Sequence, residues 1–179
     1  MSHDLLCDSY GRFYEIPYYL AKSGHQVKLI CLAYRKASGP DTRNSGNLSI
    51  CSYQLGINPL SGFIKHSCRL EEIAAGFLPD VIIAASDCYQ ILLGQRLASR
   101  QGVPFVADLY DNFEAYPASR LPGILPAFYR SLSAARAITV ISSPILTLNA
   151  ARFRGCFEWE IIRVLPLAVN PFEIGKIVS

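Results

Sequence analysis

The sequence predicts an α/β protein with a doubly wound, mostly parallel sheet and helices on both faces. First, a glycine turn at Gly11 leads into an amphipathic helix and then into the apolar segment QVKLICL. Second, the continuous apolar run VIIAAS is typical of a strand that is covered on both faces. Third, strand-like and helix-like segments alternate along the chain, as βαβ units require.

The first helix is predicted within residues 11–25, which read GRFYEIPYYLAKSGH. Lys22 complements the carbonyl end of the helix dipole, and Gly24 supplies the left-handed conformation that ends the helix. Only residues 3–7 precede the glycine turn, so we expect either a short opening strand or a clipped reading frame. The face turned toward the core is expected to hold Phe13, Ile16, Pro17, Leu20 and Ala21.

The later elements follow from apolar runs and turn residues. Residues 34–47, rich in Ser, Gly, Asp and Asn, indicate a surface loop, and Gly102 indicates a helix end. A second loop holds Asp111, Asn112, Glu114 and Pro117. The predicted strands cover residues 26–33, 48–54, 81–86, 104–110, 137–142 and 161–165, and the later helices cover 63–76, 87–101, 123–135 and 144–153.

Composition excludes several classes of protein. The chain has 179 residues, 51% of them hydrophobic, which is enough for one domain with a buried core. Its formal charge of +3 is too small to indicate a nucleic-acid partner. The 6 cysteines form no CxxC pair, so we interpret them as reduced thiols of a cytoplasmic protein. No uncharged run is long enough to cross a bilayer, which predicts a soluble or peripheral protein.

Several segments, taken in order, resemble the N-terminal half of a group 1, family 4 glycosyltransferase. These segments are GRFYEIPYYLAKSGHQV, PDVIIAA, GVPFVADLYDNFEAYP, AITVISSPI and IIRVLPLAVNPF. The resemblance implies one Rossmann-like lobe of a GT-B fold, covering residues 1–166, with residues 167–179 as the start of an interdomain linker. In that family this lobe mainly holds the acceptor, while a C-terminal domain binds the nucleotide sugar. We expect that donor domain to be absent from this chain.

The resemblance also implies site residues. Gly11 and Arg12 match a glycine-rich loop near the donor phosphates, although the family usually has two adjacent glycines; the alternative is a simple turn followed by a solvated cation. Tyr110, Asp111 and Glu114 match the loop after the fifth strand of the family, where this chain has Phe113 in place of a histidine. Asp111 and Glu114 would accept hydrogen bonds from sugar hydroxyls. Alternatively, they cap the loop, with Glu114 paired to Arg120.

The remaining candidates have mainly structural interpretations. Ser142 matches a family position that opens a helix, as an N-cap or as a contact to an anionic ligand. His25 is interpreted as structural, and neither His3 nor His66 has a partner at metal-ligand spacing, so we predict no metal and no cofactor. Residues 121–136 combine apolar and arginine side chains, and we favour an ordinary amphipathic helix over a membrane-surface contact.

The function that the resemblance implies is retaining transfer of a hexosyl unit from a nucleotide sugar to a glycan or lipid-linked acceptor. We expect this chain to be inactive without the donor domain, and no general base can be named in it. The alternative is a non-catalytic domain that binds a glycan or a partner protein. An unrelated Rossmann-like or flavodoxin-like protein ranks last, because no GxGxxG follows the first strand.

Overall fold

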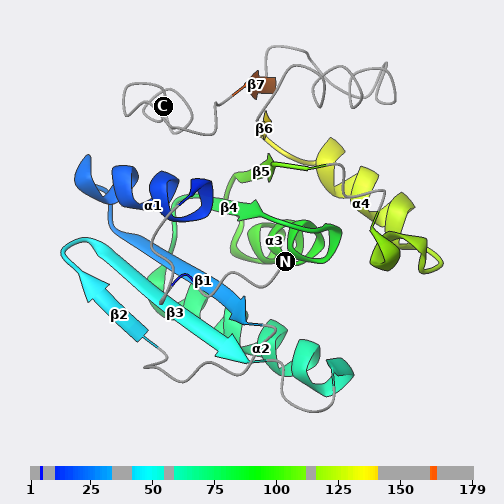
Figure 1. The fold of residues 1–179 in the computed structure, drawn as a ribbon, viewed down its shortest axis with the longest axis horizontal. Helices are drawn as coiled ribbons and strands as arrows, with labels where there is room; N and C mark the ends of the chain where they lie inside the picture. Colours follow the sequence, from blue (N-terminus) through cyan, green and yellow to red (C-terminus); the bar gives the residue numbers. More distant parts are fainter. Residues whose placement is uncertain are drawn as a thin grey trace. The chain divides into compact units, whose positions relative to one another are not determined.

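The computed structural model describes residue 5 and residues 11–33, 42–54, 59–111, 116–140 and 162–164. It divides into two compact units, Met1–Ile73 with Leu167–Ser179, and Ala74–Pro166. We describe each unit by itself (Figure 1). The described strands form two sheets, one of three strands and one of four. The predicted α/β class and the parallel pairing are confirmed. The division into one domain over residues 1–166 and a linker over residues 167–179 stays a prediction.

The first unit holds a three-stranded sheet in the order β1-β3-β2. Its elements are α1 (Arg12–Lys22), β1 (Val27–Ala33), β2 (Thr42–Ser45), β3 (Leu48–Gln54) and most of α2 (Pro59–Phe77). β1 and β3 pair in parallel, starting from Val27 opposite Leu48. The predicted core face of α1 is confirmed, since Ile16, Pro17, Leu20 and Ala21 are buried and Phe13 packs against the same core.

One prediction in this unit is wrong. Residues 34–47 were expected to be a loop, but β2 pairs antiparallel with β3, and Ser45 lies opposite Leu48. Gly46 and Asn47 form a two-residue turn between them, with Gly46 at φ 57. Short hairpin turns favour glycine because they need this left-handed backbone. β2 was not predicted because its sequence, TRNS, has no alternation of apolar and polar residues.

The second unit is built on a parallel sheet in the order β4-β5-β6-β7. Its strands are β4 (Ile82–Ala85), β5 (Phe105–Leu109), β6 (Ala137–Val140) and β7 (Ile162–Val164). The helices are α3 (Cys88–Gln101), the short 3-10 helix η2 (Pro117–Arg120) and α4 (Ile124–Ser133). Every residue of β5 is buried, which matches a strand at the centre of a covered parallel sheet.

The helices of this unit begin and end where the sequence indicates. Asp87 caps α3 by accepting a hydrogen bond from the Gln90 amide at 3.1 Å. Gly102 ends α3 in the left-handed conformation at φ 67. The core between helices and sheet includes Ile91 from α3, Leu132 from α4 and Val140 from β6, all fully buried. The η2 helix lies within the predicted loop, and the boundaries of the described elements differ from prediction by a few residues, while the predicted helix 144–153 lies outside the described residues.

α3 approaches β4 closely at Gly94. A Cβ atom on Gly94 would clash with the Ala84 methyl group and come within 3.1 Å of the Phe105 ring. The absence of a side chain therefore permits the helix to lie against the sheet. Glycine is needed here for space, and not for an unusual backbone conformation.

We expect Gly94→Ala to lower the free energy of unfolding by about 2 kcal/mol, because overpacking outweighs the gain in helix propensity. Gly76→Ala is the matched control, since a Cβ there meets no described atom within 4 Å and the residue is exposed in α2. The control should raise stability by about 0.5 kcal/mol. Urea unfolding measures both changes, and equal effects of the two substitutions would contradict the close contact.

A second expectation concerns His66 of α2, which is 5% exposed and whose Nδ1 has no hydrogen-bond partner among the described residues. Burial lowers the pKa of His66 below 6.5, so the folded state favours neutral imidazole. As the pH falls below about 6.5, the unfolded chain takes up a proton that the folded chain resists, and stability is lost.

His66→Phe should therefore lose less stability than the original chain between about pH 7.5 and pH 5.5, measured by urea unfolding at each pH. The exposed His25 provides the control substitution His25→Gln, which removes a histidine without changing the buried one. A His66→Phe variant with an unchanged pH dependence would show that His66 does not resist protonation.

Candidate functional site

The candidate site lies at the carboxyl edge of the four-stranded sheet. β4 leads into Ser86 and Asp87, and the neighbouring β5 leads into Tyr110 and Asp111. Because parallel strands end at one edge, these four residues gather there, and open α/β sheets bind their ligands at this edge. Tyr110 and Asp111 are two of the residues that the sequence singled out, and both lie at this edge.

The turn after β4 has an unusual backbone. Ser86 has φ 96, a left-handed value that residues other than glycine rarely adopt. The next residue, Asp87, already caps α3, so the chain passes from strand to helix within two residues. Backbone strain of this kind costs of order 1–3 kcal/mol and clusters at functional sites. The turn was not predicted as a site, since serine carries no sequence signal for a positive φ.

Asp111 is held by a tyrosine hydroxyl. Tyr116, just before η2, donates a hydrogen bond of 2.7 Å to the Oδ2 atom of Asp111. This bond, together with burial and the charge of Asp111, raises the pKa of Tyr116 to about 12. Tyr116 therefore stays protonated at neutral pH and fixes one oxygen of the carboxylate.

Tyr110 connects the ends of the two strands. Its phenol group interacts with the side chains of Ser86 and Tyr116. Burial raises the pKa of Tyr110, the interaction with Ser86 opposes that rise, and the charges of Asp111 and Asp87 add to it. The edge thus presents a connected group of three hydroxyls and a carboxylate, which we call the hydroxyl cluster: Ser86, Tyr110, Asp111 and Tyr116.

A buried polar pair lies further back, in the two central strands β5 and β6. Asp108 of β5 and Thr139 of β6 are both 2% exposed, and the threonine hydroxyl donates a hydrogen bond to the Oδ1 atom of Asp108. This pair was not predicted from the sequence. Its signal was available, because an aspartate inside the apolar strand FVADL requires a buried partner.

The side chains of the hydroxyl cluster are suited to recognition of hydroxyl groups on a ligand. Carboxylate oxygens accept hydrogen bonds, while serine and tyrosine hydroxyls both donate and accept. The described residues contain no group of three His, Cys, Asp or Glu side chains placed to hold a metal. The cysteines 31, 51, 68 and 88 are free thiols, and burial raises the pKa of Cys88 to about 11, so this thiol is a poor nucleophile.

Gly11 and Arg12 open α1 in the first unit. Gly11 is the helix N-cap at φ 80, and its carbonyl accepts hydrogen bonds from the Tyr14 and Glu15 amides, both at 2.9 Å. No described atom lies within 4 Å of where its Cβ would stand. Arg12 is only 5% exposed, so the interpretation of it as a solvated cation is wrong. Its expected place near a phosphate stays a prediction.

Two other candidates, Glu114 and Ser142, lie outside the described residues, as does Phe113. The proposed pairing of Glu114 with Arg120 and the N-cap role of Ser142 therefore stay predictions. His25 is exposed just after α1. Among the described residues, no helix is long and apolar enough to cross a membrane.

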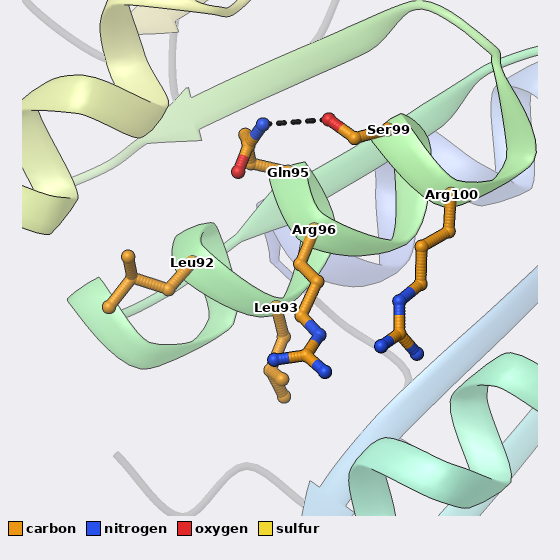
Figure 2. A pocket seen from close by; sticks show the side chains of 6 residues that line it. All are labelled: Leu92, Leu93, Gln95, Arg96, Ser99 and Arg100. Atoms are coloured by element: carbon orange, nitrogen blue, oxygen red, sulfur yellow. Dashed lines mark hydrogen bonds between the residues drawn. The ribbon is translucent and has the colours of Figure 1, made fainter.

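A depression of about 550 Å³ lies on α3, away from the residues that the sequence predicted. In Figure 2, Arg96 and Arg100 extend to the same side of the helix, and Gln95 donates a hydrogen bond of 2.8 Å to the Ser99 hydroxyl. The complete lining consists of Leu92, Leu93, Gln95, Arg96, Ser99 and Arg100. These residues come from a single helix and do not overlap the hydroxyl cluster.

Comparison with known proteins identifies the family. The model of the glycosyl transferase 4-like domain matches residues 12–167, which is most of the chain. The chain belongs to this family. No curated protein matches it. The resemblance found in the sequence is thus confirmed, and the glycosyltransferase 4-like domain is expected to meet sugar-related substrates. A hydroxyl-rich edge of the sheet fits that chemistry.

We expect Tyr116→Phe to lower the free energy of unfolding of this glycosyltransferase 4-like domain by about 1 kcal/mol at neutral pH, because Asp111 loses its tyrosine donor. The contribution of Tyr116 is present below pH 10, the ordinary tyrosine pKa, and is lost as the pH rises toward about 12. Urea unfolding at pH values on both sides of this range measures it. Tyr18→Phe is the control, since the described contacts of Tyr18 are ring contacts, and equal losses in both variants would contradict the assignment.

Proposed function

We propose that this chain forms the acceptor-side lobe of a retaining glycosyltransferase that transfers a hexosyl unit from a nucleotide sugar to a glycan or lipid-linked acceptor. Family membership over residues 12–167 supports the reaction class. The observation that supports the site is the hydrogen bond of 2.7 Å that Tyr116 donates to Asp111 at the sheet edge.

In this proposal the hydroxyl cluster binds the acceptor sugar. Tyr116 donates a hydrogen bond to the Oδ2 atom of Asp111, and a carboxylate accepts more than one hydrogen bond. A hydrogen bond to a charged carboxylate is stronger than one between neutral groups. Asp111 would therefore orient the acceptor, while Ser86 and Tyr110 contact neighbouring hydroxyls. Glu114 remains a candidate for the same role.

Gly11 and Arg12 would serve the donor side of the reaction. A helix N-terminus presents backbone amides that favour anions, and Gly11 leaves space beside the first turn of α1. In the two-lobed arrangement that the resemblance implies, the donor lobe would hold the nucleotide and complete the phosphate contacts. We infer that this chain does not turn over a nucleotide sugar by itself.

The cellular setting belongs to the same proposal. The four described cysteines are free thiols, which supports a reducing compartment such as the cytoplasm. Polysaccharide biosynthesis at the inner face of a membrane would supply both lipid-linked acceptors and nucleotide sugars. α4, which was weighed as a membrane contact, buries Phe128 and Leu132 in the core of its own unit, and this supports the ordinary amphipathic helix.

We expect Asp111→Ala to weaken binding of an acceptor analogue, octyl glucoside below its micelle concentration, by about tenfold, because a charge-assisted hydrogen bond is lost. Saturation-transfer NMR titration with the full chain measures the affinity. The control is Asp80→Ala, because Asp80 is an exposed aspartate that precedes β4 at the opposite end of that strand. Unchanged affinity in Asp111→Ala would refute the placement of the acceptor.

The same preparation tests the reaction itself. With a panel of UDP-, GDP- and dTDP-hexoses, the chain alone is expected to show no hydrolysis and no transfer to octyl glucoside. Turnover by the chain alone would contradict the inferred dependence on a donor lobe, and it would also exclude the alternative of a non-catalytic binding domain.

A further inference from the structure

A group of stacked tyrosine rings lies on α1 in the first unit. The rings of Tyr14 and Tyr18 are stacked, with centroids 5.7 Å apart and an interplanar angle of 19°. The ring of Tyr19 meets Tyr18 edge-on, with centroids 5.3 Å apart. The guanidinium of Arg43, from β2, lies over the Tyr14 ring at 5.8 Å. We call this group, Tyr14, Tyr18, Tyr19 and Arg43, the aromatic face.

The fold holds the aromatic face rigidly. Tyr14 and Tyr18 are four residues apart on a helix, so their side chains are neighbours on one side of it. Tyr14 also packs against the core that contains Leu48 and Ile50. Rings fixed in this way lose little conformational entropy when they bind a ligand. The aromatic face is therefore prepared for binding before any ligand arrives.

The outer end of the group is open to solvent. Tyr18 is 39% exposed, and few large hydrophobic side chains among the described residues are exposed to this extent or more. On β2, Arg43 lies over the Tyr14 ring, and the exposed Ser45, two residues further on, lies on the same face of the strand as Arg43. An accessible ring bordered by hydrogen-bonding groups suits a ligand that has one apolar face and a polar rim.

We propose that the aromatic face is a second sugar-binding surface, on which a hexopyranose unit of a neutral glycan stacks its C–H face against Tyr18. The C–H groups of a pyranose carry partial positive charge and match the negative face of an aromatic ring. The hydroxyls at the rim of the sugar then meet the phenol groups of the aromatic face. The chain belongs to a sugar-transferring family, which makes a glycan the chemically fitting occupant.

A lipid surface fits the same residues less well. A membrane-binding helix combines its aromatic side chains with several lysines or arginines. α1 has one exposed cation, Lys22 in its last turn, and it has Glu15 in its first turn, while its Arg12 is buried. The aromatic face belongs to the first unit and the hydroxyl cluster to the second, so this inference does not depend on the proposed function of the cluster.

NMR of the full chain with 13C-labelled tyrosine rings tests the proposal, using cellohexaose and maltohexaose as probes. We expect at least one of these oligosaccharides to shift the Tyr18 ring signals. Tyr18→Ala should weaken the binding about tenfold, whereas Tyr18→Phe, which keeps the ring, should stay within about twofold. The control substitution Lys22→Ala should leave the affinity unchanged, and Asp111→Ala should leave the Tyr18 shifts in place.

Several results would overturn the proposal. One is the absence of Tyr18 ring shifts with both oligosaccharides, which needs no variant and so does not depend on how a variant folds. Another is an unchanged affinity in Tyr18→Ala. Sedimentation with phosphatidylglycerol vesicles that is lost in Tyr18→Ala, without any oligosaccharide effect, would assign the aromatic face to a membrane instead.

Discussion

The close approach of α3 to β4 at Gly94 is the constraint on which the candidate site depends. Because Gly94 has no side chain, the helix lies against Ala84 and the Phe105 ring. The helix also begins immediately after β4, which leaves only Ser86 and Asp87 for the change of direction. The left-handed backbone of Ser86 and the cap formed by Asp87 follow from that short connection. Packing deep in the unit thus sets the geometry at its edge.

Two carboxylates of this unit accept hydrogen bonds from hydroxyl groups. Thr139 donates to Asp108 inside the sheet, and Tyr116 donates to Asp111 at its edge. A hydroxyl donor stabilises a carboxylate while leaving lone pairs and some negative charge available. Sugar hydroxyls are donors of the same chemical kind, so they can extend the pattern that the protein already uses. The raised pKa of Tyr116 keeps that donor protonated under ordinary conditions.

Most of the fold could be predicted from the sequence, because its elements obey strong local rules. The apolar runs gave β3, β4 and β5, and Asp87 and Gly102 marked both ends of α3. β2 could not be found by the same rule, since an exposed edge strand needs no apolar face. Its pairing is fixed by the Gly46 turn and by contact with β3.

The candidate site was predictable only in part. Tyr110 and Asp111 were singled out by their resemblance to the loop after the fifth strand of the family, whereas Ser86 and Tyr116 had no such signal. Ser86 interacts with Tyr110 from the end of the neighbouring strand, and Tyr116 donates to Asp111 five residues earlier; hydrophobic periodicity and turn patterns report neither side-chain contact. The burial of Arg12 likewise depends on tertiary packing, which overrides the ordinary preference of an arginine for solvent.

Both proposed sugar-binding surfaces use hydroxyl groups and rings more than net charge. The chain carries a formal charge of only +3, and the hydroxyl cluster and the aromatic face are rich in tyrosine. Tyrosine combines an apolar ring with a polar tip and loses little conformational entropy on binding, since it has few rotatable bonds. A neutral sugar offers the complementary surface, apolar on its C–H face and polar at its rim. The concentration of tyrosine at these two places is therefore best explained by recognition of a neutral, hydroxyl-rich ligand.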